Sequence, residues 1–131
     1  MLKSILLVGA GSCIGGIVRY LLLLAIKSPG NGFPLGVLLV NLIGCLLIGI
    51  IYGVISRIPG DNSDMLLLLT TGVCGGFTTF STFANDSIRL LQEHNWTSFG
   101  LYIGASVILG LLCVMAGYAI VHAISSTSAP I

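Results

Sequence analysis

Residues 65–83 read MLLLLTTGVCGGFTTFSTF, and this stretch decides the fold. It opens with a leucine block that is apolar enough to begin a membrane span. Three glycines and five threonines then fall within the fourteen residues 70–83, and both residue types are poor helix formers. Non-helical backbone at membrane depth is tolerated only where it is buried in protein or lines a water-filled cavity. The stretch therefore predicts a membrane helix that is broken mid-span.

The rest of the chain has the composition of an integral membrane protein. Of 131 residues, 56% are hydrophobic and 7% are charged, and the mean hydropathy is +1.10. A soluble domain carries about 25% charged residues, so this chain cannot cover a water-facing surface. The net charge of +1 and the scarcity of polar residues also exclude a disordered chain and a nucleic-acid-binding protein. Four cysteines without a CxxC motif are interpreted as small buried apolar side chains: Cys13, Cys45, Cys74 and Cys113.

The apolar segments predict an all-α membrane protein with four transmembrane helices in a single domain. Each span needs about 20 apolar residues. Clusters of turn residues separate the spans, such as KSPGNG at 27–32 and SRIPGDN at 56–62. The predicted spans cover residues of about 4–26, 34–56, 64–91 and 98–124. Each span also carries a glycine pair at GxxxG spacing, which predicts close helix packing. These pairs are Gly11/Gly15, Gly49/Gly53, Gly72/Gly76 and Gly100/Gly104.

The basic residues near the span ends are evenly divided between the two sides of the membrane. With four spans, Lys3 and Arg57 share one side, and Lys27 and Arg89 share the other. The positive-inside rule therefore names no preferred orientation. Copies inserted in opposite directions can pair, so the pattern is compatible with an antiparallel, dual-topology homodimer.

Polar side chains within the first two spans are candidates for function, because polar groups in hydrocarbon are costly. Arg19 lies about five residues before the apolar end of its span. It either snorkels to the interface or lines an aqueous vestibule that concentrates anions. The amide of Asn41 either bonds across helices or donates an N–H to a permeating anion.

The break in the third span has more than one chemical interpretation. Free carbonyls around Gly75 to Thr78 suit a hard cation such as sodium, as in discontinuous transporter helices. A half-helix that restarts near Thr78 or Thr79 directs its positive end at the break, which suits an anion. The alternative is a kink whose backbone is satisfied by threonine hydroxyls.

Phe80 and Phe83 follow the break at a spacing that places both rings on one helix face. Such rings are ordinarily core packing, but the edge of a phenyl ring is positive and attracts a small anion weakly. Hydroxyl donors accompany them at Ser81, Thr82, Tyr102 and Ser106. No catalytic motif competes with this interpretation, and Asp86, about one turn before Arg89, is the only carboxylate near a span interior. An enzyme is not expected.

The chain resembles the small bacterial fluoride channels of the Fluc (CrcB) family over nearly its whole length. The matching stretches are GGIVRY (15–20), GNGFPLGVLLVNLIG (30–44) and GVCGGFTTFSTF (72–83). The resemblance implies an antiparallel, dual-topology homodimer in the bacterial inner membrane that exports fluoride passively and selectively. It also implies two pores per dimer and a structural sodium ion at the dimer centre.

The resemblance assigns roles to individual residues. Backbone carbonyls of Gly75 and Thr78 from both subunits hold the sodium ion. Phe80 and Phe83 are ring-edge fluoride ligands, and Asn41 is an amide donor. The remaining pathway residues are Ser81, Thr82 and Tyr102 in the polar wall and Arg19 near a vestibule. The chain departs from the family pattern at Val37, where Thr is frequent, and at Asp86, where Glu is frequent.

Two other classes of function stay open from the residues alone. A proton-coupled exporter of small solutes or drugs, also of dual topology, needs an intramembrane carboxylate, and only Asp86 is available. A non-conducting membrane scaffold needs none. Fluoride and membrane lipid are the expected partners beside a second copy of the chain, and nucleic acid is not.

Overall fold

A computed structural model describes residues 1–127 of the chain, and this part contains helices without strands. Four segments are long and apolar enough to cross a membrane, which confirms the predicted all-α, four-span architecture. The first, second and fourth spans are α1 (Leu2–Ala25), α2 (Leu35–Ile55) and α6 (Trp96–Thr127). The third span, Ser63–Gln92, is built of shorter pieces. These are α3 (Ser63–Leu66), a π-helical segment η1 (Leu67–Cys74), α4 (Gly75–Phe77) and α5 (Phe80–Gln92).

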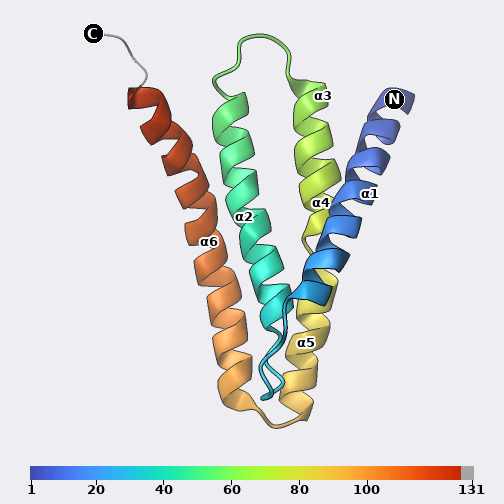
Figure 1. Ribbon diagram of the computed structural model, residues 1–131, viewed down its shortest axis with the longest axis vertical. Helices are drawn as coiled ribbons and strands as arrows, with labels where there is room; N and C mark the ends of the chain where they lie inside the picture. The colour runs from blue at the N-terminus through green and yellow to red at the C-terminus, as the bar shows by residue number, and fades with distance from the viewer. Residues whose placement is uncertain (128–131) are drawn as a thin grey trace.

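The spans run up and down, so the N-terminus, the carboxyl end of α6 and the α2–α3 connection lie at one end of the molecule (Figure 1). The α1–α2 and α5–α6 connections lie at the opposite end (Figure 1). The main packing partners are α2 with α6, and α1 with η1 and α4. Large apolar side chains cover the outside, such as Leu21 and Leu111, as expected of surfaces that face lipid.

The break in the third span lies at Thr78 and Thr79 rather than at the glycines. Both threonines have extended backbone, with ψ of 157° at Thr78 and 108° at Thr79. Gly72 lies within the π-helical segment, and Gly75 and Gly76 begin α4. The glycines were expected to break the helix and do not, whereas the restart of the helix near Thr78 or Thr79 was predicted correctly.

Gly72 and Gly76 of the third span serve close packing against α1. A Cβ atom on Gly76 would lie 2.5 Å from the Ser12 carbonyl oxygen, and one on Gly11 would lie 2.7 Å from the Gly72 Cα. Real Cβ atoms do not approach so closely, so any larger residue would push the helices apart. The predicted GxxxG pairs of the first three spans all lie at helix contacts, although Gly53 faces the Val121 side chain at 3.1 Å rather than backbone.

The glycine pair of the fourth span behaves differently. A Cβ on Gly100 or Gly104 would meet nothing within 4 Å, so this pair makes no helix contact within the described chain. In α6 it is Gly117 that approaches α2, where an added Cβ would lie 2.5 Å from the Leu46 carbonyl oxygen. The prediction for Gly100 and Gly104 is therefore wrong for packing within one chain.

The cysteines are all free, but they are not all buried. Cys74 is buried, Cys45 and Cys113 are half-buried, and Cys13 is exposed on α1. Because α1 is one of the spans that face lipid, the Cys13 thiol behaves there as a small apolar side chain at the surface.

Ion pairs connect neighbouring segments at both ends of the bundle. At the end that holds the termini, Lys3 forms an ion pair with Asp64 and ties α1 to α3. At the other end, Arg89 lies 3.9 Å from Asp86 and 3.4 Å from Glu93, so it contacts both carboxylates. The Arg89 Nη2 also donates to the Gly32 carbonyl at 3.1 Å and so holds the α1–α2 connection against α5.

Candidate functional site

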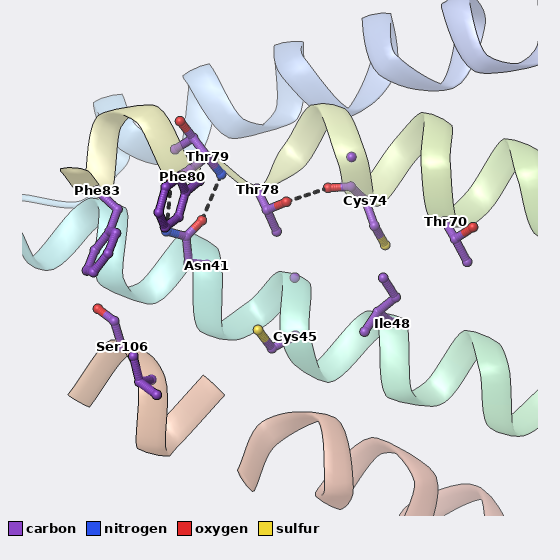
Figure 2. A pocket seen from close by; sticks show the side chains of 13 residues that line it. Asn41, Cys45, Ile48, Thr70, Cys74, Thr78, Thr79, Phe80, Phe83 and Ser106 are labelled. Atoms are coloured by element: carbon purple, nitrogen blue, oxygen red, sulfur yellow. Dashed lines mark hydrogen bonds between the residues drawn. The ribbon is translucent and has the colours of Figure 1, made fainter. Parts of the chain in front are cut away.

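A hollow of about 390 Å³ lies beside the break, between the third span, α2 and α6 (Figure 2). Its lining is mostly apolar, with a few uncharged polar groups, and includes no carboxylate, lysine or arginine. In Figure 2 the Cys45 and Cys74 side chains approach it from α2 and from η1. Its principal lining residues are Asn41, Cys45 and Ile48 of α2, Thr78, Thr79, Phe80 and Phe83 of the third span, and Ser106 of α6.

Asn41 holds the break open through two hydrogen bonds with one residue. The Thr79 backbone N–H donates to Asn41 Oδ1 at 2.9 Å, and Asn41 Nδ2 donates to the Thr79 carbonyl at 3.2 Å (Figure 2). These bonds replace helical partners that the extended backbone has lost. Of the two interpretations of Asn41, the structure therefore shows the bond across helices. An amide nitrogen carries two hydrogens, and one of them stays without a partner in residues 1–127.

Thr79 also caps the half-helix that follows the break. Its Oγ1 accepts from the Thr82 backbone N–H at 3.3 Å and donates to Thr82 Oγ1 at 2.9 Å. The pairing of Thr79 with Asn41 was not predicted from the sequence. The preference of threonine for the N-cap position is the signal that locates the start of α5 at this residue.

Arg19 reaches the break from α1. Its Nη1 donates to the Thr78 carbonyl at 3.3 Å, and the side chain is half-buried. The Thr78 hydroxyl donates to the Cys74 carbonyl at 2.9 Å and satisfies the end of the preceding helix. Arg19 therefore lies next to the hollow's backbone wall rather than among the loops at the span end.

The Gly75 carbonyl has lost its usual helical partner. In a continuous helix it would accept from the Thr79 backbone N–H, four residues on. That N–H is bound to Asn41 instead. Gly75 and Thr78 both line the hollow, so the structure brings together the two residues named for a cation site.

The two phenylalanines lie side by side after the break, with ring centroids 5.7 Å apart. Phe80 is 79% exposed, whereas Phe83 is half-buried. Phe83 packs against Tyr102 at 5.2 Å, and Tyr102 packs edge-on against Phe33 at 5.8 Å. Phe80 thus contributes little to the core of this chain, while Phe83 belongs to a row of three rings.

Two buried hydroxyls beside these rings lack hydrogen bonds of ordinary geometry. The Ser106 Oγ has no partner among the described residues and lies on the side of Phe83 (Figure 2). The Tyr102 hydroxyl makes no such bond either, although it interacts with the Asp86 carboxylate at longer range. Because buried polar groups are usually paired, the Ser106 hydroxyl is available as a donor on the wall of the hollow.

A second hollow, of about 360 Å³, lies under the α1–α2 connection. Thr82, Asp86 and Arg89 line it together with Phe33 and Val37. Through Phe33 and Tyr102, the row of rings runs from this second hollow to Phe83 at the first. Val37 and Asp86, the two departures from the family pattern, therefore border one space.

The structure does not gather every predicted pathway residue in one place. Thr82 lines the second hollow rather than the first, and Ser81 is exposed and lines neither. Tyr102 is fully buried between the two. Arg19 contacts the break from the side of α1.

Comparison with known proteins identifies the family of the chain. Residues 6–118 match the model of the family described as "CrcB-like protein, Camphor Resistance (CrcB)". The chain belongs to the CrcB family. A relative from Phocaeicola vulgatus, named fluoride-specific ion channel FluC, is 50% identical over 117 residues, which cover 88% of this chain and 96% of the relative.

Other members of the CrcB family with the same name are almost as similar. The one from Rhizobium meliloti is 47% identical over 93% of this chain and 98% of its own length. The one from Chlorobaculum tepidum is 41% identical over 89% of this chain and 93% of its own length. The predicted family is thus confirmed, and its named members are ion channels rather than enzymes. With its four spans, the chain is a multi-pass protein of the bacterial inner membrane.

Proposed function

We propose that the chain is a passive, highly selective fluoride channel that exports fluoride from the cytoplasm. The single observation that carries the proposal is the hollow at the break, where all polar groups are uncharged. It offers an amide hydrogen of Asn41, the Ser106 hydroxyl and the exposed ring of Phe80. The names of the similar CrcB proteins support fluoride as the ion.

Uncharged donors suit the transport of a small, strongly hydrated anion. A pore must replace the water of the ion but must also release it, so donors have to be numerous and individually weak. Amide and hydroxyl hydrogens and the positive edges of phenyl rings meet this requirement. A membrane potential contributes about 2.3 kcal/mol per charge per 100 mV, which drives an anion out of a cell whose interior is negative. No coupling residue is needed for this direction of transport.

Individual residues then have defined roles in the proposed pathway. Phe80 and Phe83 present ring edges to fluoride, and Asn41 both holds the break and donates its free amide hydrogen. Tyr102, Ser81 and Thr82 contribute hydroxyls to the polar wall. Arg19 attracts anions toward a vestibule, and its bond to the Thr78 carbonyl fixes it beside the pathway.

The pathway is completed, in this proposal, by a second copy in the opposite orientation. The 79% exposure of Phe80 leaves one side of the site without protein in a single chain. The even division of Lys3 and Arg57 against Lys27 and Arg89 supports insertion in both directions. A two-fold axis between the copies generates two equivalent pores per dimer.

A structural sodium ion is proposed at the centre of this dimer. The Gly75 carbonyl lacks its helical N–H partner, and the Thr78 carbonyl retains a second lone pair beside its bond to Arg19. Hard oxygen atoms of unwound backbone are the ligands that sodium takes in transporters. The residues present therefore fit a sodium ion, which would join the broken spans of the two copies.

Efflux from proteoliposomes tests the function directly. Vesicles that contain the protein are loaded with fluoride or with chloride, and ion-selective electrodes measure the efflux of each anion. The measurement is made at equal and at unequal pH across the membrane. We expect fluoride to leave rapidly, chloride to stay, and the proton gradient to make no difference. Fluoride efflux that requires a proton gradient would establish the coupled exporter instead, and absence of flux would establish a scaffold. The Asp86 carboxylate lies 3.9 Å from Arg89, which disfavours it as a freely exchanging proton carrier.

The antiparallel dimer has its own test. Added lysines in the loops of one end fix the orientation of a copy, and the opposite set fixes the reverse. Each biased variant alone is expected to be inactive, and coexpression of the two is expected to restore flux. Full activity of one biased variant alone would contradict the antiparallel arrangement.

A further inference from the structure

A third hollow, of about 440 Å³, lies far from the break, between the carboxyl ends of α2 and α6. Neither the proposed pore nor the sodium site uses it. From α2 and the residues after it come Gly53, Ser56 and Arg57, and from α6 come Met115, Tyr118 and His122. Among residues 1–127, no aspartate or glutamate lines this space.

Arg57 is the cation of this hollow, and its charge is not neutralised within the described chain. Lys3 at the same end is paired with Asp64, and Arg89 at the other end contacts two carboxylates. Arg57 has no ion pair and its side chain has no hydrogen bond in residues 1–127. An unpaired guanidinium in a carboxylate-free hollow favours an anionic group.

The order of side chains along α6 matches the layers of a membrane leaflet. His122 lies nearest the carboxyl end of the helix, Tyr118 one turn deeper and Met115 almost one turn deeper again. Arg57 follows directly after α2, which ends at Ile55, so it lies at the depth of lipid headgroups. Tyr118 is 46% exposed, in the position of an interfacial aromatic residue, and Met115 is 65% exposed at the depth of acyl chains.

We propose that this hollow binds an anionic phospholipid, with the phosphate held by Arg57 and the acyl chain lying over Met115. Arginine binds phosphate through two parallel N–H donors, and the ring N–H of His122 and the Tyr118 hydroxyl are further donors along the same wall. Basic pockets between membrane helices are known to hold anionic headgroups. The absence of a carboxylate leaves nothing to attract the ammonium group of a zwitterionic lipid.

Lipid retention by the purified protein tests this site without any measurement of fluoride transport. The protein is exchanged into mild detergent with equal amounts of phosphatidylglycerol and phosphatidylcholine, and bound lipid is counted by native mass spectrometry. The variants are Arg57→Gln, Arg57→Lys and, as a matched control, Lys27→Gln. Lys27 is also without an ion pair in the described chain, but it lines none of the three hollows.

Phosphatidylglycerol is expected to remain bound to the wild type and to Lys27→Gln in preference to phosphatidylcholine. Loss of one charged hydrogen-bond pair corresponds to about a tenfold drop in affinity, which is the expectation for Arg57→Gln. Arg57→Lys should retain an intermediate amount, because it keeps the charge and loses the paired donors.

Several results would overturn the proposal. Equal retention by Arg57→Gln and Lys27→Gln would show that Arg57 binds no lipid. Displacement of the lipid by millimolar inorganic phosphate would assign the hollow to free anions. Lipid found on single chains and never on dimers would assign this face to a second copy. Equal retention of phosphatidylcholine would remove the requirement for a negative headgroup.

Discussion

The two faces of the third span differ in how closely other atoms approach them. On the side of α1, an added Cβ on Gly76 would lie 2.5 Å from the Ser12 carbonyl oxygen. One residue earlier, an added Cβ on Gly75 would find only the Thr70 carbonyl of its own helix, at 3.6 Å. Gly75 borders the hollow, and Phe80 further along is 79% exposed. Neighbouring glycines of one motif therefore serve packing on one face and leave room on the other.

This difference separates the parts of the span that stabilise the chain from the parts that serve transport. The face toward α1 contains helix backbones in direct contact, and substitution there must move a whole helix. The face toward the hollow contains hydroxyls, an amide and rings whose partners are few. Substitutions that compare the two faces should change stability on one side and flux on the other.

The largest effect is expected for Gly76→Ala. The new methyl group must displace the α1 backbone, and overpacking of this kind costs about 3 kcal/mol. Gly75→Ala, whose methyl group meets no other helix, should be nearly neutral for stability. Unfolding in mixed micelles measures both variants, with Gly104→Ala as a second control. Equal stability of Gly76→Ala and Gly75→Ala would remove the distinction between the faces.

The next effect is expected for Asn41→Leu, which removes both hydrogen bonds to Thr79. Two lost bonds and two unsatisfied backbone groups correspond to about 2 kcal/mol of stability. Flux should also fall at least tenfold, because the break loses its geometry. Ile43→Val on the same helix is the control, because the Ile43 side chain is 39% exposed and lines none of the three hollows, and it should leave fluoride flux nearly unchanged. Normal fluoride flux through Asn41→Leu would show that the transport pathway does not depend on the geometry of the break.

Phe80→Ile and Phe83→Ile should separate transport from packing within one helix face. Loss of a ring edge should reduce fluoride flux about tenfold in both variants, the equivalent of about 1.4 kcal/mol. Only Phe83→Ile should also lose stability, by about 1 kcal/mol, because only Phe83 packs against Tyr102. Efflux assays and unfolding of the same preparations measure the two quantities. Unchanged flux in both variants would show that the two rings serve packing and not transport.

The smallest effect, but of unusual sign, is expected for Ser106→Ala. Removal of a buried hydroxyl without a partner should raise stability by about 1 kcal/mol, while flux falls about threefold through loss of one weak donor. Ser87 is the matched control, because its hydroxyl donates to the Phe83 carbonyl at 2.8 Å. Ser87→Ala should therefore lower stability. A loss of stability in both variants would show that Ser106 has a partner after all.

Composition was sufficient to predict four membrane helices, since 7% charged residues allow no other environment. The unusual run of Gly and Thr was sufficient to predict a break in the third span. It also predicted the restart near Thr78 or Thr79. It did not predict that the glycines before the restart stay helical, because poor helix formers are tolerated in a helix when tertiary packing favours them. Gly76 stays helical against α1, and the break forms where Asn41 supplies hydrogen bonds from 38 residues away.

The sequence was sufficient to predict which residue types form the site, but not which side chains contact one another. Phe80 and Phe83 were expected on one face, and their rings are neighbours. Spacing along one helix does not reveal that Tyr102 of α6 buries Phe83 and leaves Phe80 uncovered. The same holds for Arg19, whose contact with the Thr78 carbonyl depends on the packing of α1 against α4.

The paired hydrogen bonds between Asn41 and Thr79 join helices that are synthesised at different times. The third span is a 30-residue segment with only a modest interruption, so it can enter the bilayer as one continuous helix. Extended backbone at Thr79 is stable in hydrocarbon only when Asn41 forms hydrogen bonds with it. Asn41 belongs to α2, which is inserted earlier. We therefore expect the break to form after insertion, when α2 and the third span pack together in the membrane. A variant that lacks the amide would be delivered to the membrane normally and would fail afterwards, as a straight helix in the correct topology.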